Sequence, residues 1–337
     1  LRPGSWWNTG MRISVAFPPT PETPAHIELA EELGYQTAWV YDTPALQLDV
    51  WMTLALAAER TDRIRLGPGV LIPSLRHPMV TASAIATLVD LVGEDRVIIG
   101  AGTGFTGRRA MGQKPLKWTD FPEMIHQIQA LLRGETIRYD GELISMLHWD
   151  GQAPERPIEV PWILGVNGPR GLNIAAEMGC GVFTSRPRPD ASYERLDDVI
   201  LLTSGAVMSG DETVDSPRVI ETAGPWVSVA YHAFLEQNDQ RLGTLPNADE
   251  FRRLVEQVPE DGRHLWVHEG HLTHLNDIDR EVVVGESMFL SPFTLYENEV
   301  VDQITELEAN GITEIAYQPM GDIEREMRTF ASAAGIA

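Results

Sequence analysis

The sequence has little cysteine and no long hydrophobic run. Its single cysteine, Cys180, excludes an intramolecular disulfide and favours a reducing compartment, so we expect a cytoplasmic protein. Cys180 lies in the apolar segment GCGVF, where a buried, unreactive thiol is expected. No apolar run approaches the length that crosses a bilayer, and no signal peptide is recognisable, so we expect no membrane partner.

Positive charge is also scarce. The chain has 26 lysines and arginines against 49 aspartates and glutamates, a formal net charge of −23. A field of this sign disfavours nucleic acids and anionic membranes as partners, and we interpret it mainly as an aid to solubility. With 337 residues, 43% of them hydrophobic, the chain is long enough for one large barrel or for two ordinary domains.

The first ten residues, LRPGSWWNTG, contain no methionine and precede Met11, where a clear strand pattern begins. We therefore expect residues 1–10 to be a leader and residues 11–337 to form a single barrel domain. No linker-like stretch, fixed-period repeat or low-complexity tract divides this region.

From Met11 onward, strand and helix patterns alternate. Strands are expected at residues 12–17, 37–41, 64–66 with 70–72, 97–99, 161–166, 181–184, 218–222 and 313–318. Helices are expected at residues 24–33, 49–60, 81–92, 121–132, 168–178, 190–210, 227–237, 248–258, 298–309 and 321–334, with a hairpin at 135–146. Eight alternating units predict an α/β fold, a (β/α)₈ TIM barrel with insertions. An open doubly wound sheet is the alternative, but it requires a separate second half.

Glycines gather where the third and fourth strands end. Gly67-Pro68-Gly69-Val70 follows the third strand, and Gly102-Thr103-Gly104 follows the fourth. Bare backbone at the carboxyl ends of neighbouring parallel strands indicates a flat group pressed against it, and the Thr103 hydroxyl can donate or accept a hydrogen bond. Simple structural turns are the alternative for both segments.

A third glycine segment, Gly168-Pro169-Arg170, opens the helix after the fifth strand. Free N–H groups at a helix start attract an anion, and a guanidinium adds a fork that fits phosphate. We expect a phosphate here, with an ordinary helix N-terminus as the alternative.

The segments RHPMVTASAIATLVDL and GEDRVIIGAGTG resemble the bacterial-luciferase-like family, whose members use reduced FMN or the deazaflavin coenzyme F420. The sequence of these two segments is most similar to the F420-dependent branch, which includes methylenetetrahydromethanopterin reductases. The resemblance runs from Met11 to the C-terminus and is weak over residues 185–295. It implies a luciferase-like barrel, a flavin-type cofactor and, as the family's default, a homodimer.

The resemblance also implies roles for single residues. It places a non-prolyl cis peptide at Gly69–Val70, behind the flavin, and the cofactor phosphate on Gly168-Pro169. Arg76 could face the cofactor or cap the surface. Two further arginines, Arg108 and Arg109, could reach an acidic cofactor tail.

Asp42 matches a family aspartate that can orient substrate or flavin. In several F420-dependent dehydrogenases the residue after this aspartate is a histidine acting as acid or base, but here it is Thr43. The proton donor or acceptor is therefore left open by the resemblance.

Four histidines, His264, His268, His271 and His274, have no obvious family role. Their spacing lacks the H-E-x-x-H pattern of zinc enzymes, and we expect no metal site, although the four could share a helix face. His268 or His271 is a candidate for the substrate pocket or for a general acid.

Three functions remain in order of preference. The first is an F420-dependent oxidoreductase that transfers a hydride between reduced deazaflavin and a small-molecule organic substrate. The second is a reduced-FMN-dependent monooxygenase that uses molecular oxygen. The third is a barrel that binds flavin without catalysis. The variable region 185–295 is expected to form most of the substrate pocket and does not identify the substrate.

Overall fold

The computed structural model describes residues 10–187 and 193–337. Its main sheet contains eight strands: β1 (Arg12–Phe17), β2 (Thr37–Val40), β3 (Arg65–Pro68), β4 (Ile99–Gly102), β7 (Trp162–Gly165), β8 (Gly181–Thr184), β9 (Val199–Thr203) and β12 (Glu314–Tyr317). They follow the order β3-β2-β1-β12-β9-β8-β7-β4, and all neighbouring pairs are parallel. Bridges at Leu66–Val97 and Leu71–Ala101 join the two ends, so the barrel prediction is confirmed.

The strands are buried on both faces because each separates the barrel interior from surrounding helices. A compact inner cluster fills the barrel: Ala16, Trp39, Tyr41, Ile98, Ile163, Phe183, Ile200 and Ala316. A larger cluster on the outer face joins the strands to the helices. The strands thus read as nearly continuous apolar runs, which is why most of them were predicted from the sequence.

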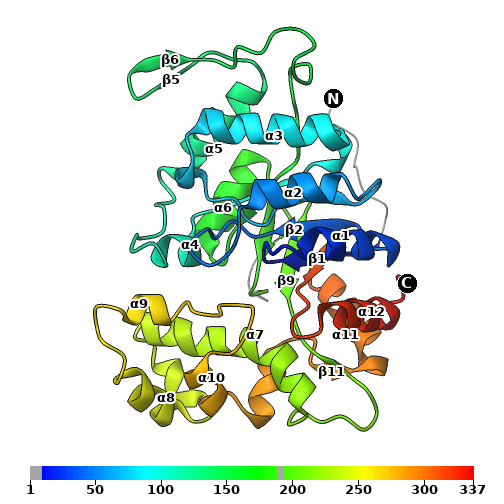
Figure 1. Ribbon diagram of the computed structural model, residues 1–337, viewed down its shortest axis with the longest axis vertical. Helices are drawn as coiled ribbons and strands as arrows, with labels where there is room; N and C mark the ends of the chain where they lie inside the picture. The colour runs from blue at the N-terminus through cyan, green and yellow to red at the C-terminus, as the bar shows by residue number, and fades with distance from the viewer. Residues whose placement is uncertain (1–9, 188–192) are drawn as a thin grey trace.

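Helices surround the barrel: α1 (Thr23–Glu32), α2 (Val50–Ala58), α3 (Pro78–Val92), α5 (Phe121–Leu132), α6 (Pro169–Met178), α11 (Val300–Ala309) and α12 (Ile323–Ala333). Figure 1 shows α1, α2 and α3 as successive layers along one flank. Asp49 begins α2 by accepting hydrogen bonds from the N–H groups of Trp51 and Met52, at 2.9 and 3.1 Å. Short 3₁₀ segments are η1 (Pro73–Leu75), η2 (Glu94–Arg96), η3 (Gln240–Thr244), η4 (Gly285–Leu290) and η5 (Glu297–Glu299).

Charged side chains close the end of the barrel where the strands begin. Glu314, at the start of β12, lies 3.0 Å from Arg12 at the start of β1 and accepts a hydrogen bond from Trp39 Nε1. Arg12 also lies 2.5 Å from Asp198, directly before β9. Burial raises the pKa of Asp198 even though Arg12 opposes the change. The network ties four strands together at the end opposite to the glycine loops.

A large insertion separates β9 from β12. It contains β10 (Val207–Met208), α7 (Pro217–Glu236), α8 (Ala248–Val255), α9 (Arg263–Trp266), α10 (Asp277–Val282) and β11 (Leu295–Tyr296). These helices share a second hydrophobic cluster of their own, and Figure 1 shows α7 to α10 gathered beside the barrel. The expected hairpin is present as β5 (Ile137–Tyr139) and β6 (Glu142–Ile144), and the short helix α4 (Phe105–Arg109) follows β4.

Two element predictions were wrong. Residues 199–203 form β9 rather than part of a helix over 190–210, of which residues 190–192 lie outside the described residues. Residues 218–222, predicted as a strand, belong to the first turns of α7. Ser216 and Pro217 start that helix, and Pro225 lies inside it without ending it. The seventh barrel strand is therefore β9.

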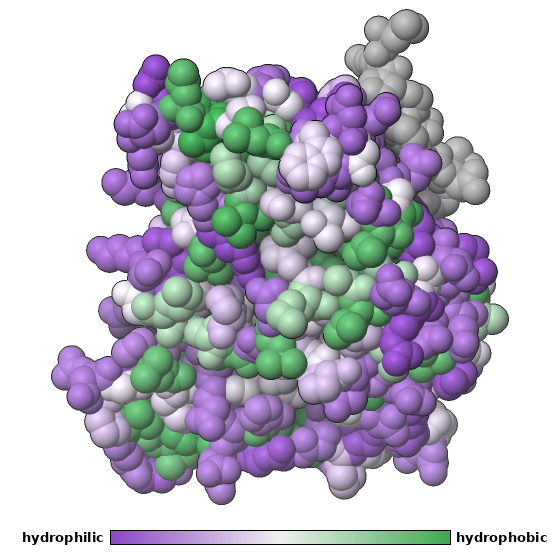
Figure 2. Space-filling model, turned by 45° about the horizontal axis from the view of Figure 1, so that its top comes forward, coloured by the Kyte–Doolittle hydropathy of each residue, from purple (hydrophilic) through white to green (hydrophobic). Residues whose placement is uncertain are grey.

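Figure 2 shows hydrophobic and neutral residues in the middle of one face and hydrophilic residues along its margins. The exposed apolar side chains include Met52 and Leu56 on α2 and Val80 on α3. Among the described residues, no helix combines the length and hydrophobicity needed to cross a membrane.

Candidate active site

A cavity of about 460 Å³ opens at the carboxyl ends of the barrel strands. Segments that follow β2, β3, β4, β7 and β8 form its wall, together with His271 and Leu272 from the insertion. The predicted site residues that line it are Asp42, Gly69, Val70, Gly102, Thr103, Gly104, Gly168 and His271. Four others, Arg76, Pro169, Arg170 and His268, are not part of its lining, and neither are Arg108 and Arg109, which were considered for a cofactor tail.

The peptide bond between Gly69 and Val70 is cis, at the position expected from the sequence. Both residues line the cavity. A Cβ on Gly102 would lie 2.5 Å from Val70 Cγ2, and one on Gly165 would lie 3.3 Å from Val70 Cγ1. The glycines opposite the bulge thus make room for the Val70 side chain. A Cβ on Gly69 itself would meet Trp39 Cβ at 2.8 Å.

Gly168 differs from the other cavity glycines because a Cβ there would meet no atom within 4 Å. It is the N-cap of α6, and no side chain caps the first turn of that helix. Its bare backbone therefore borders open space beside free helical N–H groups, an arrangement that suits an anion. Arg170, in the same turn, is exposed.

Asp42 is buried at the cavity wall and is held by Arg76. Its Oδ2 accepts hydrogen bonds from Arg76 at 2.7 Å and from the N–H of Ile72 at 3.2 Å. Arg76 also donates to Asp49 at 3.0 Å. Burial alone would lower the pKa of Arg76, but the two carboxylates outweigh it and raise that pKa. Arg76 thus acts on the cavity through Asp42.

His271 enters the cavity from the insertion. Its Nε2 lies 3.3 Å from the Thr106 hydroxyl on α4. Thr43 lines the same cavity, and a Cβ on Gly107, the residue after Thr106, would meet Thr43 Cγ2 at 3.2 Å. Burial, with smaller effects from His268 and His232, lowers the pKa of His271, so the ring is neutral near pH 7.

His268 is 2% exposed and lies behind His271, with 5.8 Å between their ring centroids. The predicted common helix face for the four histidines was wrong, because α9 ends at Trp266. His264 and His274 are exposed. Within residues 10–187 and 193–337, no three His, Cys, Asp or Glu side chains are arranged to hold a metal ion.

A buried hydrogen-bonded chain fixes the loop that carries His271. The Tyr41 hydroxyl donates to Gln318 Oε1 at 2.5 Å, and Gln318 Nε2 donates to the Leu272 carbonyl oxygen. Leu272 has a φ of +58°, which a residue with a branched side chain rarely adopts. Tyr41 and Gln318, which follow β2 and β12, thus hold the loop over the mouth of the barrel.

Sequence reasoning missed several residues that line the cavity or support it: Tyr41, Thr106, Trp118, Asn167, Ser185 and Gln318. Asn167 Oδ1 accepts from the Thr184 hydroxyl at 2.9 Å and from the Ser185 N–H at 3.1 Å, which joins the loops after β7 and β8. Three of the six directly follow a strand and Asn167 lies two residues after one, and that position in a parallel barrel could have identified them.

The two arginines considered for an acidic tail have protein partners. Arg108 donates to the Lys114 carbonyl oxygen at 2.7 Å and to the Ser74 hydroxyl at 2.5 Å. Arg109 lies 3.2 Å from Glu236 on α7, with its guanidinium over the Phe105 ring. Cys180 is buried, which raises the pKa of its thiol to about 12.

Known proteins are similar to this chain in sequence and in fold. A 5,10-methylenetetrahydromethanopterin reductase from Archaeoglobus fulgidus is 33% identical over 56% of this chain and 58% of its own. An F420-dependent glucose-6-phosphate dehydrogenase from Beutenbergia cavernae is 33% identical over 70% of this chain and 73% of its own. The matches to the reductases cover about half of each relative's length, between 50% and 58%.

The solved structure of a coenzyme F420-dependent tetrahydromethanopterin reductase from Methanopyrus kandleri has the same fold. It superposes with a TM-score of 0.65 at 21% identity and covers 96% of this chain and 98% of its own. A sequence profile of the luciferase-like monooxygenases matches residues 7–203, more than half of the chain. The chain therefore belongs to the luciferase-like monooxygenase family.

Proposed function

We propose that the protein is an F420-dependent oxidoreductase that transfers a hydride between the deazaflavin and a small organic substrate. The observation that carries the proposal is the cavity itself. It combines the cis Gly69–Val70 bulge with the glycines at the end of β4 and at the start of α6. The relatives of the chain include an enzyme named as an F420-dependent glucose-6-phosphate dehydrogenase, and a coenzyme F420-dependent reductase has the same fold.

The residues present fit a flavin-type cofactor. Val70 lines the cavity together with the bare backbone of Gly102 and Gly165, and the ring system would lie against them. The open space at Gly168, beside the N-terminus of α6, suits a phosphate. Coenzyme F420, when bound, would supply or accept the hydride.

The remaining chemistry belongs to side chains of the protein. Asp42, held by Arg76 and the Ile72 N–H, presents a fixed negative charge at the cavity wall. His271, beside Thr106, carries a neutral ring that can give or take the proton that accompanies hydride transfer. Trp118, Phe183 and Leu202 make much of the remaining wall apolar, which helps to exclude water from the reacting groups.

The proposal is tested with purified protein under anaerobic conditions. Reduced coenzyme F420 is mixed with a panel of activated alkenes, imines and carbonyl compounds, and the absorbance of the oxidised cofactor is followed. We expect at least one compound to oxidise the cofactor in an enzyme-dependent way, and we expect His271→Gln to slow this by about 100-fold. Oxygen consumption with reduced FMN, without any reaction of the deazaflavin, would instead indicate a monooxygenase.

A further inference from the structure

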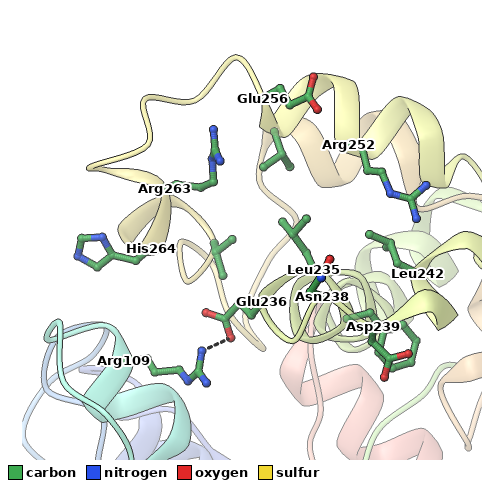
Figure 3. A pocket seen from close by; sticks show the side chains of 13 residues that line it. Arg109, Leu235, Glu236, Asn238, Asp239, Leu242, Arg252, Glu256, Arg263 and His264 are labelled. Atoms are coloured by element: carbon green, nitrogen blue, oxygen red, sulfur yellow. Dashed lines mark ion pairs between the residues drawn. The ribbon is translucent and has the colours of Figure 1, made fainter.

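A second cavity of about 470 Å³ lies on the other side of His268 from the candidate active site. Its lining comes from α4, from the C-terminal end of α7, and from α8 and α9, and it includes Arg109, Glu236, Arg263 and His264. Figure 3 shows the Glu236 carboxylate directed toward Arg109, between the insertion and the barrel. The exposed His264 and Glu256 show that this cavity reaches solvent.

Three titratable side chains connect the two cavities. His271 lines the first cavity and Glu236 lines the second, while the buried His268 lies between them. His268 Nε2 is 3.4 Å from Glu236 Oε1, and the rings of His268 and His271 meet edge to face at 5.8 Å between centroids. Neither nitrogen of His268 nor Nδ1 of His271 forms a hydrogen bond with any described residue.

Buried imidazole nitrogens without partners are costly, so a purely structural role does not account for this arrangement. Imidazole can bind a proton at one nitrogen while it releases one from the other, which makes histidine suited to passing protons. Other titratable groups lie near these three side chains. The Arg109 guanidinium is 3.2 Å from the Glu236 carboxylate, and His232 Nε2 is 2.8 Å from Asp279 Oδ1. Burial alone would raise the pKa of Glu236, but His268, Arg109 and His232 together lower it.

We propose that Glu236 and His268 carry protons between solvent in the second cavity and His271 in the active site. The inference rests on the proposed function, because a hydride transfer in a filled active site leaves one proton to be supplied or removed. When the substrate is reduced, His271 gives a proton to it. Glu236 then takes a proton from water, passes it to His268, and His268 passes it to His271. Each step breaks one N–H or O–H bond and forms another, and oxidation of the substrate runs the steps in reverse.

The first test needs neither cofactor nor substrate. Exchange of the His271 ring N–H with solvent is measured by ¹⁵N-edited NMR on the complete, cofactor-free protein. We expect Glu236→Gln and His268→Gln each to slow this exchange by about tenfold or more, and Glu236→Asp to restore it. Glu256→Gln is the matched control, because Glu256 lines the same cavity directly after α8, whereas the carboxylate 3.4 Å from His268 belongs to Glu236.

The same exchange rate in the wild-type protein and in Glu236→Gln would overturn the proposal, as would equal slowing by Glu256→Gln. A ring proton that exchanges too fast to be seen in both the wild-type protein and Glu236→Gln also counts against it. Thermal unfolding of each variant shows whether it is folded, and His268→Gln supplies the second measurement if Glu236→Gln does not fold.

A second measurement follows turnover with reduced coenzyme F420. We expect Glu236→Gln to reduce kcat by about tenfold, to leave the KM of the cofactor unchanged, and to be rescued by added formate or acetate. If Glu236→Gln keeps both the wild-type rate of His271 proton exchange and the wild-type turnover with F420, the proton transfer through Glu236 and His268 is refuted and the proposed function is not. Failure of the wild-type protein to bind the cofactor would refute the proposed function and leave the NMR result standing separately.

Discussion

Val70 determines which residues can stand opposite it at the ends of β4 and β7. Gly102 and Gly165 each face one of its methyl groups, whereas Gly168 faces open space. The absence of a side chain at these three cavity positions thus has two different physical reasons. Two are required by packing inside the protein, and one keeps room for a ligand.

This difference gives a matched pair of variants. Gly102→Ala brings a methyl group to within 2.5 Å of Val70 Cγ2, so we expect a loss of about 1–3 kcal/mol in the free energy of unfolding. Gly168→Ala meets no atom within 4 Å and should change this free energy by less than about 0.5 kcal/mol. It should instead weaken binding of coenzyme F420 by about tenfold. Urea denaturation and fluorescence titration measure the two effects, and equal stability of both variants would contradict this explanation.

At the residue scale, the sequence predicted the backbone of the site better than its side chains. Gly69, Val70 and Gly102 could be placed because each lies at the end of a strand or within two residues after it. His271 was only one of two candidates, with His268, because its contact with Thr106 joins residues 165 positions apart. No local pattern reports such a contact.

Arg218 joins the insertion to the last helix of the barrel. It donates to Glu212 at 2.6 and 2.7 Å, and to Glu326 on α12 at 2.6 Å. These bonds attach the first turn of α7 to the barrel. The hydrogen bonds from Arg218 lower the pKa of Glu212 from 4.5 to about 2, although burial opposes the change.

The contact predicts how stability depends on pH. Because the pKa of Glu212 is lower in the folded protein, its stabilising effect is complete above about pH 4.5 and is lost as the pH falls toward 2. We expect Glu212→Gln to make the free energy of unfolding less dependent on pH between 5 and 3. Chemical denaturation at several pH values measures this, with the exposed Glu281→Gln as control. An unchanged pH dependence in Glu212→Gln would show that the pair does not stabilise the fold.

At the element scale, both predictions that were wrong fall where two signals competed. Val199–Thr203 is apolar and rich in branched side chains, as expected for a strand, but the helical interpretation of its surroundings obscured it. The segment PRVIET has alternating character, but Ser216 and Pro217 are a typical helix start. The remaining barrel strands were predicted to within a few residues because each is a continuous apolar run between helices.

At the scale of the whole molecule, the two ends of the barrel have different tasks. One end carries the glycine loops and the cavity, and the other is held by the buried Glu314 network. Glu314 is fully buried and contacts Arg12 from β1 and Trp39 from β2, so it reports on closure of the barrel.

Glu314→Gln removes a charge that faces Arg12 at 3.0 Å and Arg65 at 3.9 Å. We expect the free energy of unfolding to fall by about 3 kcal/mol, since a buried ion pair that loses one partner leaves the other charge poorly compensated. Urea denaturation measures the change. The exposed Glu308→Gln on α11 is the control, and an equal effect of both variants would argue against a specific role for the network.

The most direct test of the central claim is a fluorescence titration of the cofactor-free protein with coenzyme F420 and, separately, with FMN. We expect the deazaflavin to bind with a dissociation constant of about 1 μM or lower and FMN to bind at least about tenfold more weakly. The opposite preference would contradict an F420-dependent hydride transfer, and binding of neither cofactor would contradict any flavin-type enzyme in this cavity.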